Sequence, residues 1–401
     1  MKKTTTPINL PKNRNYNEPQ LKTHRHKRLT INAQKVDKRL IKVDNSRFHK
    51  TISSMTLRER GQKIQQQILR DIKYHPNDIT KHISQIFSIS RQAVNKHLKK
   101  LVAADMLEAS GSTRNKVYKL GSYRSYKKTF KLNKKLSEHD IYRRDFFWVF
   151  EELPKNIEEI IFYGFTEIVN NAIDHSQGTE CYIEVMKNKE QVYIFIQDNG
   201  EGIFKRITRL KALSDEKQAI LELYKGKLTT DPKNHSGQGI FFASKMFDNF
   251  TIASYELVFN HHHKFKFDFI NDNKSQNNNE GTAVLMDISI DSLRTDKEIF
   301  DQFSGNEDEN YAFNKTVIPV NMSRIDKENL VSRSQAKRLL SRVDSFKYVA
   351  FDFKGVESVG QAFADEIFRV YRQRYPQIFI SYQNANDAVN RMIKRAEADL
   401  N

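Results

Sequence analysis

The sequence predicts a multidomain α+β protein, on the strength of three successive patterns along the chain. With 401 residues, the chain is long enough for two or three domains, each with its own core. The first third is basic and carries short helical patterns. The middle third has one long amphipathic helix followed by strands and glycine-rich turns. The last third alternates strands with helices, which favours a small α/β layer.

The changes of pattern set the expected domain boundaries. The first stretch is polar and basic, contains three prolines and lacks apolar periodicity, as expected of a disordered arm. In chain order, we expect a basic disordered arm (1–54), a helix-turn-helix domain (55–122), a linker (123–155), a central α/β domain (156–292), a second linker (293–310) and a C-terminal α/β domain (311–401).

Positive charge is concentrated at the N-terminal end. Residues 1–130 hold 30 Lys and Arg residues against 8 Asp and Glu, a net charge of +22. The rest of the chain holds 37 against 41, a net charge of −4, and the two parts give the total of +18. A basic third on a near-neutral body indicates a polyanionic partner rather than a general effect on solubility.

Cysteine content and hydropathy indicate the compartment. Cys181 is the single cysteine of the sequence, which excludes a disulfide framework and a cage of thiolate metal ligands. No apolar run approaches the length of a membrane span, and the N-terminus lacks the apolar segment of a signal peptide. We therefore expect a soluble cytoplasmic protein without a membrane partner.

The basic third contains the pattern of a winged helix-turn-helix. Helices are predicted at 63–74, 79–87 and 91–104, and two strands at 106–109 and 116–120 would form a hairpin with a basic tip. Residues 90–98 (Ser-Arg-Gln-Ala-Val-Asn-Lys-His-Leu) resemble bacterial winged-helix regulators that silence or activate genes. In that motif the third helix enters the major groove of DNA.

The resemblance makes DNA the expected partner of this domain. Side chains suited to base edges and phosphates face outward on the third predicted helix, and one more lies at the hairpin tip. The expected DNA-contacting residues are Arg91, Gln92, Asn95, Lys96, Lys99 and Arg114. Winged helices also dock proteins, so a protein-binding role remains the alternative.

A carboxylate and a carboxamide lie four residues apart on the long central helix. Glu167 and Asn171 therefore project from one helical face, one turn apart. The Asn171 carboxamide offers a neutral oxygen to Mg²⁺, and Glu167 is placed to take a proton from a water or hydroxyl that attacks a phosphate. The alternative is that both residues belong to an ordinary solvated face.

Three further segments, each containing glycine, follow this helix along the chain. Residues 198–203 (Asp-Asn-Gly-Glu-Gly-Ile) end a buried strand, residues 235–240 (His-Ser-Gly-Gln-Gly-Ile) open an apolar helix, and Gly281-Thr282 leads into the strand at 283–288. Together with the helix, the series resembles the Bergerat ATP-binding fold of the GHKL superfamily over about residues 140–290. That superfamily joins DNA gyrase, heat-shock chaperone, histidine kinase and MutL ATPases.

The resemblance implies an ATP and Mg²⁺ site. It makes Glu167 the general base, Asn171 the Mg²⁺ ligand and Asp198 the acceptor for the adenine amino group. Two pairs of glycines would bring the backbone close to the nucleotide and present N–H groups to its phosphates, and a threonine would line the adenine pocket. These residues are Gly200, Gly202, Gly237, Gly239 and Thr282. The basic segment between the two glycine boxes would be the lid over the site.

The C-terminal pattern predicts strands at 316–320, 348–353 and 378–382 alternating with helices. Residues 332–340, 351–358 and 363–368 resemble the STAS-like domain found fused to GHKL modules in bacteria. STAS partners of anti-sigma kinases carry a phosphorylatable serine after the second strand, and Ser358 lies near that point. The residues that follow it, Val-Gly-Gln, depart from the expected context. The alternative is that Ser358 caps the next helix.

These resemblances imply an ATP-binding, ATP-hydrolysing regulator that binds DNA. Nucleotide would switch the arrangement of the domains or dimerisation, and a homodimer is left open. One alternative is an anti-sigma-type serine kinase that phosphorylates its own or a partner's STAS domain. Another is a binding module that never turns ATP over. The STAS-like domain leaves room for a protein partner.

Overall fold

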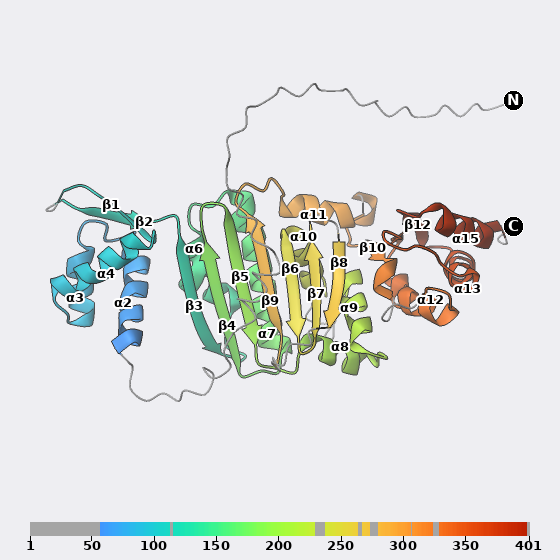
Figure 1. Cartoon of the computed structure of the whole chain (residues 1–401), viewed down its shortest axis with the longest axis horizontal. Coiled ribbons are helices and arrows are strands. Elements are labelled where there is room, and N and C mark those ends of the chain that lie inside the picture. Colours follow the sequence, from blue (N-terminus) through green and yellow to red (C-terminus); the bar gives the residue numbers. More distant parts are fainter. Residues whose placement is uncertain are drawn as a thin grey trace, which may run out of the picture. The chain divides into compact units, whose positions relative to one another are not determined.

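The computed structural model of the chain is of mixed α/β type with three separate sheets, which fits the expected multidomain α+β class (Figure 1). The residues that it describes are 57–112, 115–228, 237–263, 267–272, 280–305, 307–323 and 329–398. The expected N-terminal arm, Arg114 and part of the expected lid lie outside these residues. Within them, no helix combines the length and the apolar character that crossing a membrane requires.

From Leu57, where the described part of the chain begins, three helices and a two-stranded antiparallel hairpin follow one another. Fully buried Ile68, Ile83 and Leu98, one from each helix, form their common core. The elements are α2 (Leu57–Asp71), α3 (Ile79–Phe87), α4 (Arg91–Ala103), β1 (Leu107–Ser110) and β2 (Val117–Leu120).

The tight turn between α3 and α4 follows from two serines. Ser88 takes a left-handed conformation, φ 51°, and ends α3. Ser90 begins α4, because its Oγ accepts a hydrogen bond from the N–H of Ala93 at 3.2 Å. The element order is the expected one. The first helix, however, begins at Leu57 rather than residue 63, since its first turn is polar and gives no apolar periodicity.

The segment that we expected to be a linker at 123–155 is part of the central sheet. Strand β3 (Arg124–Lys131) pairs antiparallel with β4 along its whole length. Its side chains Tyr126 and Phe130 are buried. Lys128, between them on the same face, donates from Nζ to the buried Asp145 at 3.0 Å, whereas Lys127 and Lys131 are exposed; these lysines give the segment its basic, loop-like composition. After it come α5 (Glu138–Ile141), the π-helical turn η2 (Tyr142–Phe146) and α6 (Phe147–Phe150).

The central sheet has seven strands in the order β3-β4-β5-β9-β6-β7-β8, and every neighbouring pair is antiparallel. Helices α7 and α10 lie side by side on one face of the sheet (Figure 1). The remaining strands are β4 (Glu180–Lys187), β5 (Gln191–Asp198), β6 (Asn249–Ser254), β7 (Leu257–His262), β8 (Phe267–Asp272) and β9 (Ala283–Ser289). The helices of this region are α7 (Lys155–His175), α8 (Ile203–Lys211), α9 (Glu216–Lys225) and α10 (Gly239–Met246).

The second expected linker, at 293–310, contains helix α11 (Asp296–Phe303). Thr295 and Glu298 form a capping box at its start, which fixes the helix locally. Phe300 and Phe303 then pack against Phe242 of α10. This stretch is therefore an ordered part of the protein rather than a simple connection.

The C-terminal region alternates strands and helices as expected. Its strands β10, β11 and β12 form a parallel sheet in that order. The strands and helices are β10 (Lys315–Pro319), α12 (Arg333–Leu340), β11 (Tyr348–Asp352), α13 (Gln361–Asp365), α14 (Arg372–Arg374), β12 (Phe379–Gln383) and α15 (Asp387–Ala398). Short 3₁₀ or π turns are η3 (Glu307–Glu309), η4 (Val320–Ser323), η5 (Val343–Ser345) and η6 (Glu366–Tyr371).

Candidate functional site

A pocket lies between α7, α10 and the ends of β5 and β9, with walls from α8 and α9. Its cavity volume is about 350 Å³. It brings together seven of the eight residues expected to form a nucleotide site, which come from four separate stretches of the chain. These residues are Glu167, Asn171, Asp198, Gly202, Gly237, Gly239 and Thr282.

Glu167 and Asn171 lie one turn apart on α7 and both line the pocket, as the spacing predicts. Both side chains are half-buried. Gly239 at the start of α10 faces them, and a Cβ on Gly239 would collide with Oε2 of Glu167. A glycine at this position therefore gives the Glu167 carboxylate its room beside the first turn of α10.

Asp198 ends β5 at the floor of the pocket and is 7% exposed. Its Oδ1 accepts hydrogen bonds from the N–H groups of Gly200 at 2.8 Å and Thr282 at 3.3 Å. Burial outweighs these bonds and raises the pKa of the Asp198 carboxyl to about 6. Thr282 also accepts a bond at Oγ1 from the N–H of Ile203 at 2.9 Å, which fixes the start of α8 against β9.

Gly200 is the expected site residue that does not line the pocket. A Cβ at Gly200 would collide with the carbonyl oxygen of Ser176, so the chain itself requires the glycine. Gly202 lines the pocket and has a φ of +88°, a conformation that side chains rarely adopt. A Cβ there would also meet Oγ of Ser254 at 2.6 Å. Close packing within the protein thus accounts for both glycines.

Arg206 on α8 is a pocket residue that the sequence did not single out from the other basic residues of the expected lid. Its side chain is 17% exposed, and within the described part of the chain its Nε and Nη1 have no hydrogen-bond partner. Its Nη1 lies 3.9 Å from Oε2 of Glu201, within ion-pair distance, while the Glu201 carboxylate accepts two hydrogen bonds of 2.7 Å from Arg209. The spacing of three residues from Ile203, on the same helical face, is the signal that could have identified Arg206.

Other lining residues also escaped prediction. Two polar ones, Asn170 and His175, come from α7. The apolar walls are made by Ile168, Ile196, Ile203, Ile207, Leu223, Leu228, Ile240, Phe241 and Val284. Walls of this kind suit a flat apolar ring system, with the polar groups left to orient it.

The residues expected to contact DNA lie on the outer face of α4. The five that the structure describes are all exposed: Arg91, Gln92, Asn95, Lys96 and Lys99. Val94 and Leu98, on the opposite face, are fully buried. A basic helix face is therefore available to a polyanion.

Ser358 is exposed in the loop after β11. The N-cap of the following helix, α13, is Gly360, without a capping side chain. The alternative, that Ser358 caps this helix, is therefore wrong, because the N-cap lies two residues later, at Gly360.

Comparison with known proteins gives one match to a protein-family model, in the C-terminal region, and short stretches of similarity to curated proteins. Residues 335–390 match a protein-family model described as a STAS-like domain of unknown function (DUF4325). The C-terminal domain is STAS-like. That expectation from the sequence is confirmed.

The chain is also similar to sensor proteins named VraS. It is 31% identical to the one from Staphylococcus saprophyticus over 74 residues, which is 18% of this chain and 21% of the relative. It is 30% identical to the one from Staphylococcus haemolyticus over 87 residues, 21% of this chain and 23% of the relative. The chain thus spans about a fifth of the length of these relatives.

Proposed function

We propose that this protein is an ATP-binding, Mg²⁺-dependent ATPase whose nucleotide site regulates DNA binding by an N-terminal winged helix. The observation that carries the proposal is the convergence of four distant sequence segments on one pocket, with Glu167, Asn171 and Asp198 all facing it. Seven of the eight residues that the GHKL resemblance assigns to ATP and Mg²⁺ line this pocket. The similarity to the VraS sensor proteins is consistent with a kinase-like or ATP-binding regulator.

The pocket has the size and chemistry for a nucleotide. Its volume of about 350 Å³ falls in the range of roughly 300–1,000 Å³ typical of small-molecule sites. The adenine ring would pack between apolar walls, and the Asp198 carboxylate would accept a hydrogen bond from its amino group. The N–H groups at the start of α10 would face the phosphates.

Asn171 and Glu167 fit a Mg²⁺–phosphate site. Mg²⁺ is usually held by one or two protein oxygens together with phosphate oxygens and water, so the Asn171 carboxamide is a suitable protein ligand. When bound, the ion would offset negative charge on the phosphates. Glu167, one turn away, would then take the proton from the attacking water.

The exposed face of α4 supports the DNA-binding half of the proposal. Three helices and a hairpin have the order of a winged helix, and the third helix presents five polar or basic side chains. Lys and Arg on such a face would contact phosphates, while Gln92 and Asn95 would suit base edges. ATP would act on this domain by favouring one of two arrangements or a dimer.

A serine kinase is the second candidate, because Ser358 of the STAS-like domain is exposed. Glu167 would then take the proton from a serine hydroxyl instead of water. In that case label from the γ-phosphate of ATP would remain on the protein and would be lost with Ser358→Ala.

Equilibrium binding of a fluorescent ATP analogue tests the proposal. Wild type is expected to bind, and Asp198→Asn to bind at least about tenfold more weakly. The amide oxygen would remain with the N–H groups of Gly200 and Thr282, so an NH2 donor would face the adenine amino group and a hydrogen bond worth about 1.5 kcal/mol or more would be lost. Asp287→Asn is the matched control, since Asp287 is buried, also has a pKa raised by burial to about 6, and does not line the pocket. Absence of binding by wild type would refute the proposal.

A further inference from the structure

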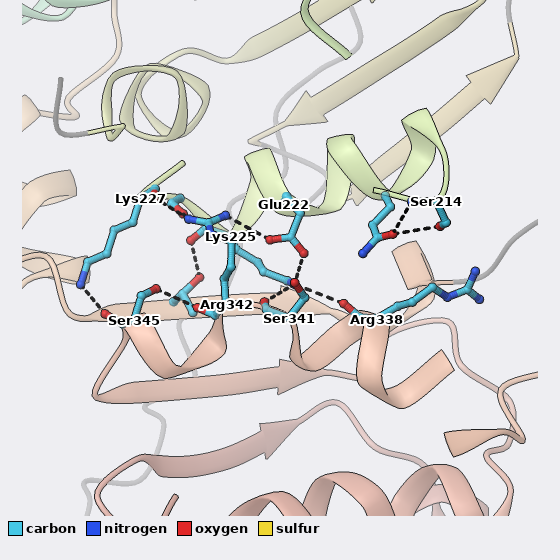
Figure 2. Close-up of polar contacts among 11 residues, drawn as sticks. Ser214, Glu222, Lys225, Lys227, Arg338, Ser341, Arg342 and Ser345 are labelled. Carbon is cyan, nitrogen blue, oxygen red and sulfur yellow. Dashed lines mark hydrogen bonds and ion pairs between the residues drawn. The ribbon is translucent and has the colours of Figure 1, made fainter. Parts of the chain in front are cut away.

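One wall of the pocket is joined to the STAS-like domain by a cluster of three charged residues, two of them fully buried and the third, Arg342, half-buried (Figure 2). Glu222 and Lys225 lie one turn apart on α9, and both are completely buried. Lys225 Nζ donates to Glu222 Oε1 at 2.8 Å. Arg342, which follows α12, donates from Nη1 to Glu222 Oε2 at 3.0 Å.

Lys225 also binds the C-terminal end of α12. Its Nζ donates to the carbonyl oxygens of Ser341 at 2.7 Å and Arg338 at 3.4 Å. The last carbonyls of a helix lack partners within the helix and attract cations. Lys225 therefore places a buried positive charge at the carbonyl end of α12, where the Arg338 carbonyl also accepts from the N–H of Ser341 at 3.4 Å.

Residues of the STAS-like domain also form hydrogen bonds with the turn that follows α9. Arg342 Nη2 donates to the carbonyl oxygens of Gly226, at 3.2 Å, and of Lys227. Lys227 Nζ in return donates to the carbonyl oxygen of Ser345 at 2.6 Å. Figure 2 shows these contacts bridging the two sides.

The segment that these hydrogen bonds fix, from α9 to the turn after it, also forms part of the pocket wall. Leu223 lies between the two charged residues of α9, and Leu228 follows the turn; both line the cavity. The N–H of Leu228 donates to the carbonyl oxygen of Gly237 at 3.1 Å. Gly237 also lines the pocket, and Gly239, two residues on, lies against Glu167. A continuous path of contacts thus runs from the STAS-like domain to the expected catalytic carboxylate.

We infer that the STAS-like domain regulates nucleotide binding by holding this wall of the pocket in place. When the domain is docked, Leu223, Leu228 and Gly237 stand where they form the cavity. When it is released, the wall loses its anchors, and nucleotide must order it at a cost in affinity. This inference rests on the proposed nucleotide site.

The coupling is reciprocal. If docking of the domain strengthens nucleotide binding, nucleotide must stabilise docking by the same factor. Buried ion pairs add little net stability compared with apolar side chains of the same shape, so stability alone does not account for three charges here. Their directed bonds instead hold α9 and α12 in one relative position.

The test measures the dissociation constant of a fluorescent ATP analogue on the full chain. Arg342→Ala is expected to weaken binding about 5- to 150-fold, the usual range for coupling between sites. Arg372→Ala is the matched control. Arg372 is also a partly buried, ion-paired arginine of the STAS-like domain. Its Nη1 lies 2.8 Å from Oε1 of Glu397 and its Nη2 donates to the carbonyl oxygen of Ile380 at 2.9 Å, both on the C-terminal side of that domain. It should bind as wild type does.

Hydrogen exchange on wild type gives a second readout that needs no variant. ATP analogue is expected to slow exchange of the α12 amides, because it favours the docked domain. Equal affinity of wild type and Arg342→Ala, together with unchanged exchange in α12 when nucleotide is bound, would overturn the inference and leave the proposed function standing. If wild type bound no nucleotide at all, the proposed function itself would fail.

Discussion

Asp198 and Thr282, far apart in the sequence, hold each other through two hydrogen bonds at the floor of the pocket. The N–H of Asp198 donates to the carbonyl oxygen of Thr282 at 2.9 Å, and Oδ1 of Asp198 accepts from the N–H of Thr282 at 3.3 Å. The first glycine box and the terminal Gly-Thr of the resemblance therefore form one structural unit, in which the Asp198 carboxylate is fixed before any ligand arrives.

The first prediction concerns pH. Burial raises the pKa of Asp198 to about 6, so the group is ionised above that pH and protonated below it. Since the carboxylate is the proposed acceptor for the adenine amino group, nucleotide affinity should be constant above pH 7 and fall by up to about tenfold per unit below pH 6. Titrations of a fluorescent ATP analogue between pH 5 and 8 measure this dependence. A pH dependence that persists in Asp198→Asn would assign it to another group.

The second prediction concerns Arg206. Its Nε and Nη1 are buried without a hydrogen-bond partner in the described part of the chain, so a ligand acceptor in the pocket would satisfy them. Bonds to a charged group contribute about 1.5–3 kcal/mol, and Arg206→Ala should therefore weaken ATP binding by about 10- to 100-fold. Lys211→Ala, an exposed position on the same helix, is the control. Equal losses in the two variants would indicate a general effect of charge.

The third prediction concerns the stability of the buried cluster. Glu222→Gln should lower the free energy of unfolding by about 3–5 kcal/mol, because Lys225 and Arg342 both lose their carboxylate partner. Urea unfolding measures the change. Glu108→Gln removes an exposed pair with Lys119, which solvent screens, and should lower the free energy of unfolding far less than Glu222→Gln does. An equally small loss of unfolding free energy in Glu222→Gln would mean that water or another group replaces the Glu222 carboxylate as the partner of Lys225 and Arg342.

The fourth prediction concerns DNA. Lys96→Ala on the outer face of α4 should weaken DNA binding on all sequences and reduce the slope of log affinity against log salt by about one. Fluorescence anisotropy with duplex DNA at several salt concentrations gives both quantities. Lys73→Ala is the control, since Lys73, which follows α2 rather than lying on α4, is bonded to Glu151. If neither variant changed binding, α4 would not be the contact surface.

Local signals in the sequence predicted much of the fold. Helix α3 forms over the residues expected for it, because its apolar period and the serine-rich turn after it are both local features. Strand β3 was missed. Its inward residues Tyr126 and Phe130 are interrupted on the same face by Lys128, which is half-buried and bonded to Asp145, and only pairing with β4 reveals the segment as a strand.

The candidate site was predictable where a residue type and its spacing carry the chemistry, as for Glu167 and Asn171. It was not predictable where tertiary packing decides. Arg206 lines the pocket, unlike the other basic residues of α8, because of the direction that this helix takes after Gly202. The bonds of Lys225 to α12 join segments more than a hundred residues apart, which no local pattern records.

The central claim is most directly tested by incubating the purified full chain with γ-labelled ATP and Mg²⁺ and following free phosphate and protein-bound label together. The proposed ATPase should release phosphate without labelling the protein, and release should disappear in Asn171→Ala and Glu167→Gln. Absence of both free phosphate and label would contradict turnover and remove the catalytic role of Glu167. Label that remains on the protein and vanishes in Ser358→Ala would contradict the ATPase and establish the serine kinase.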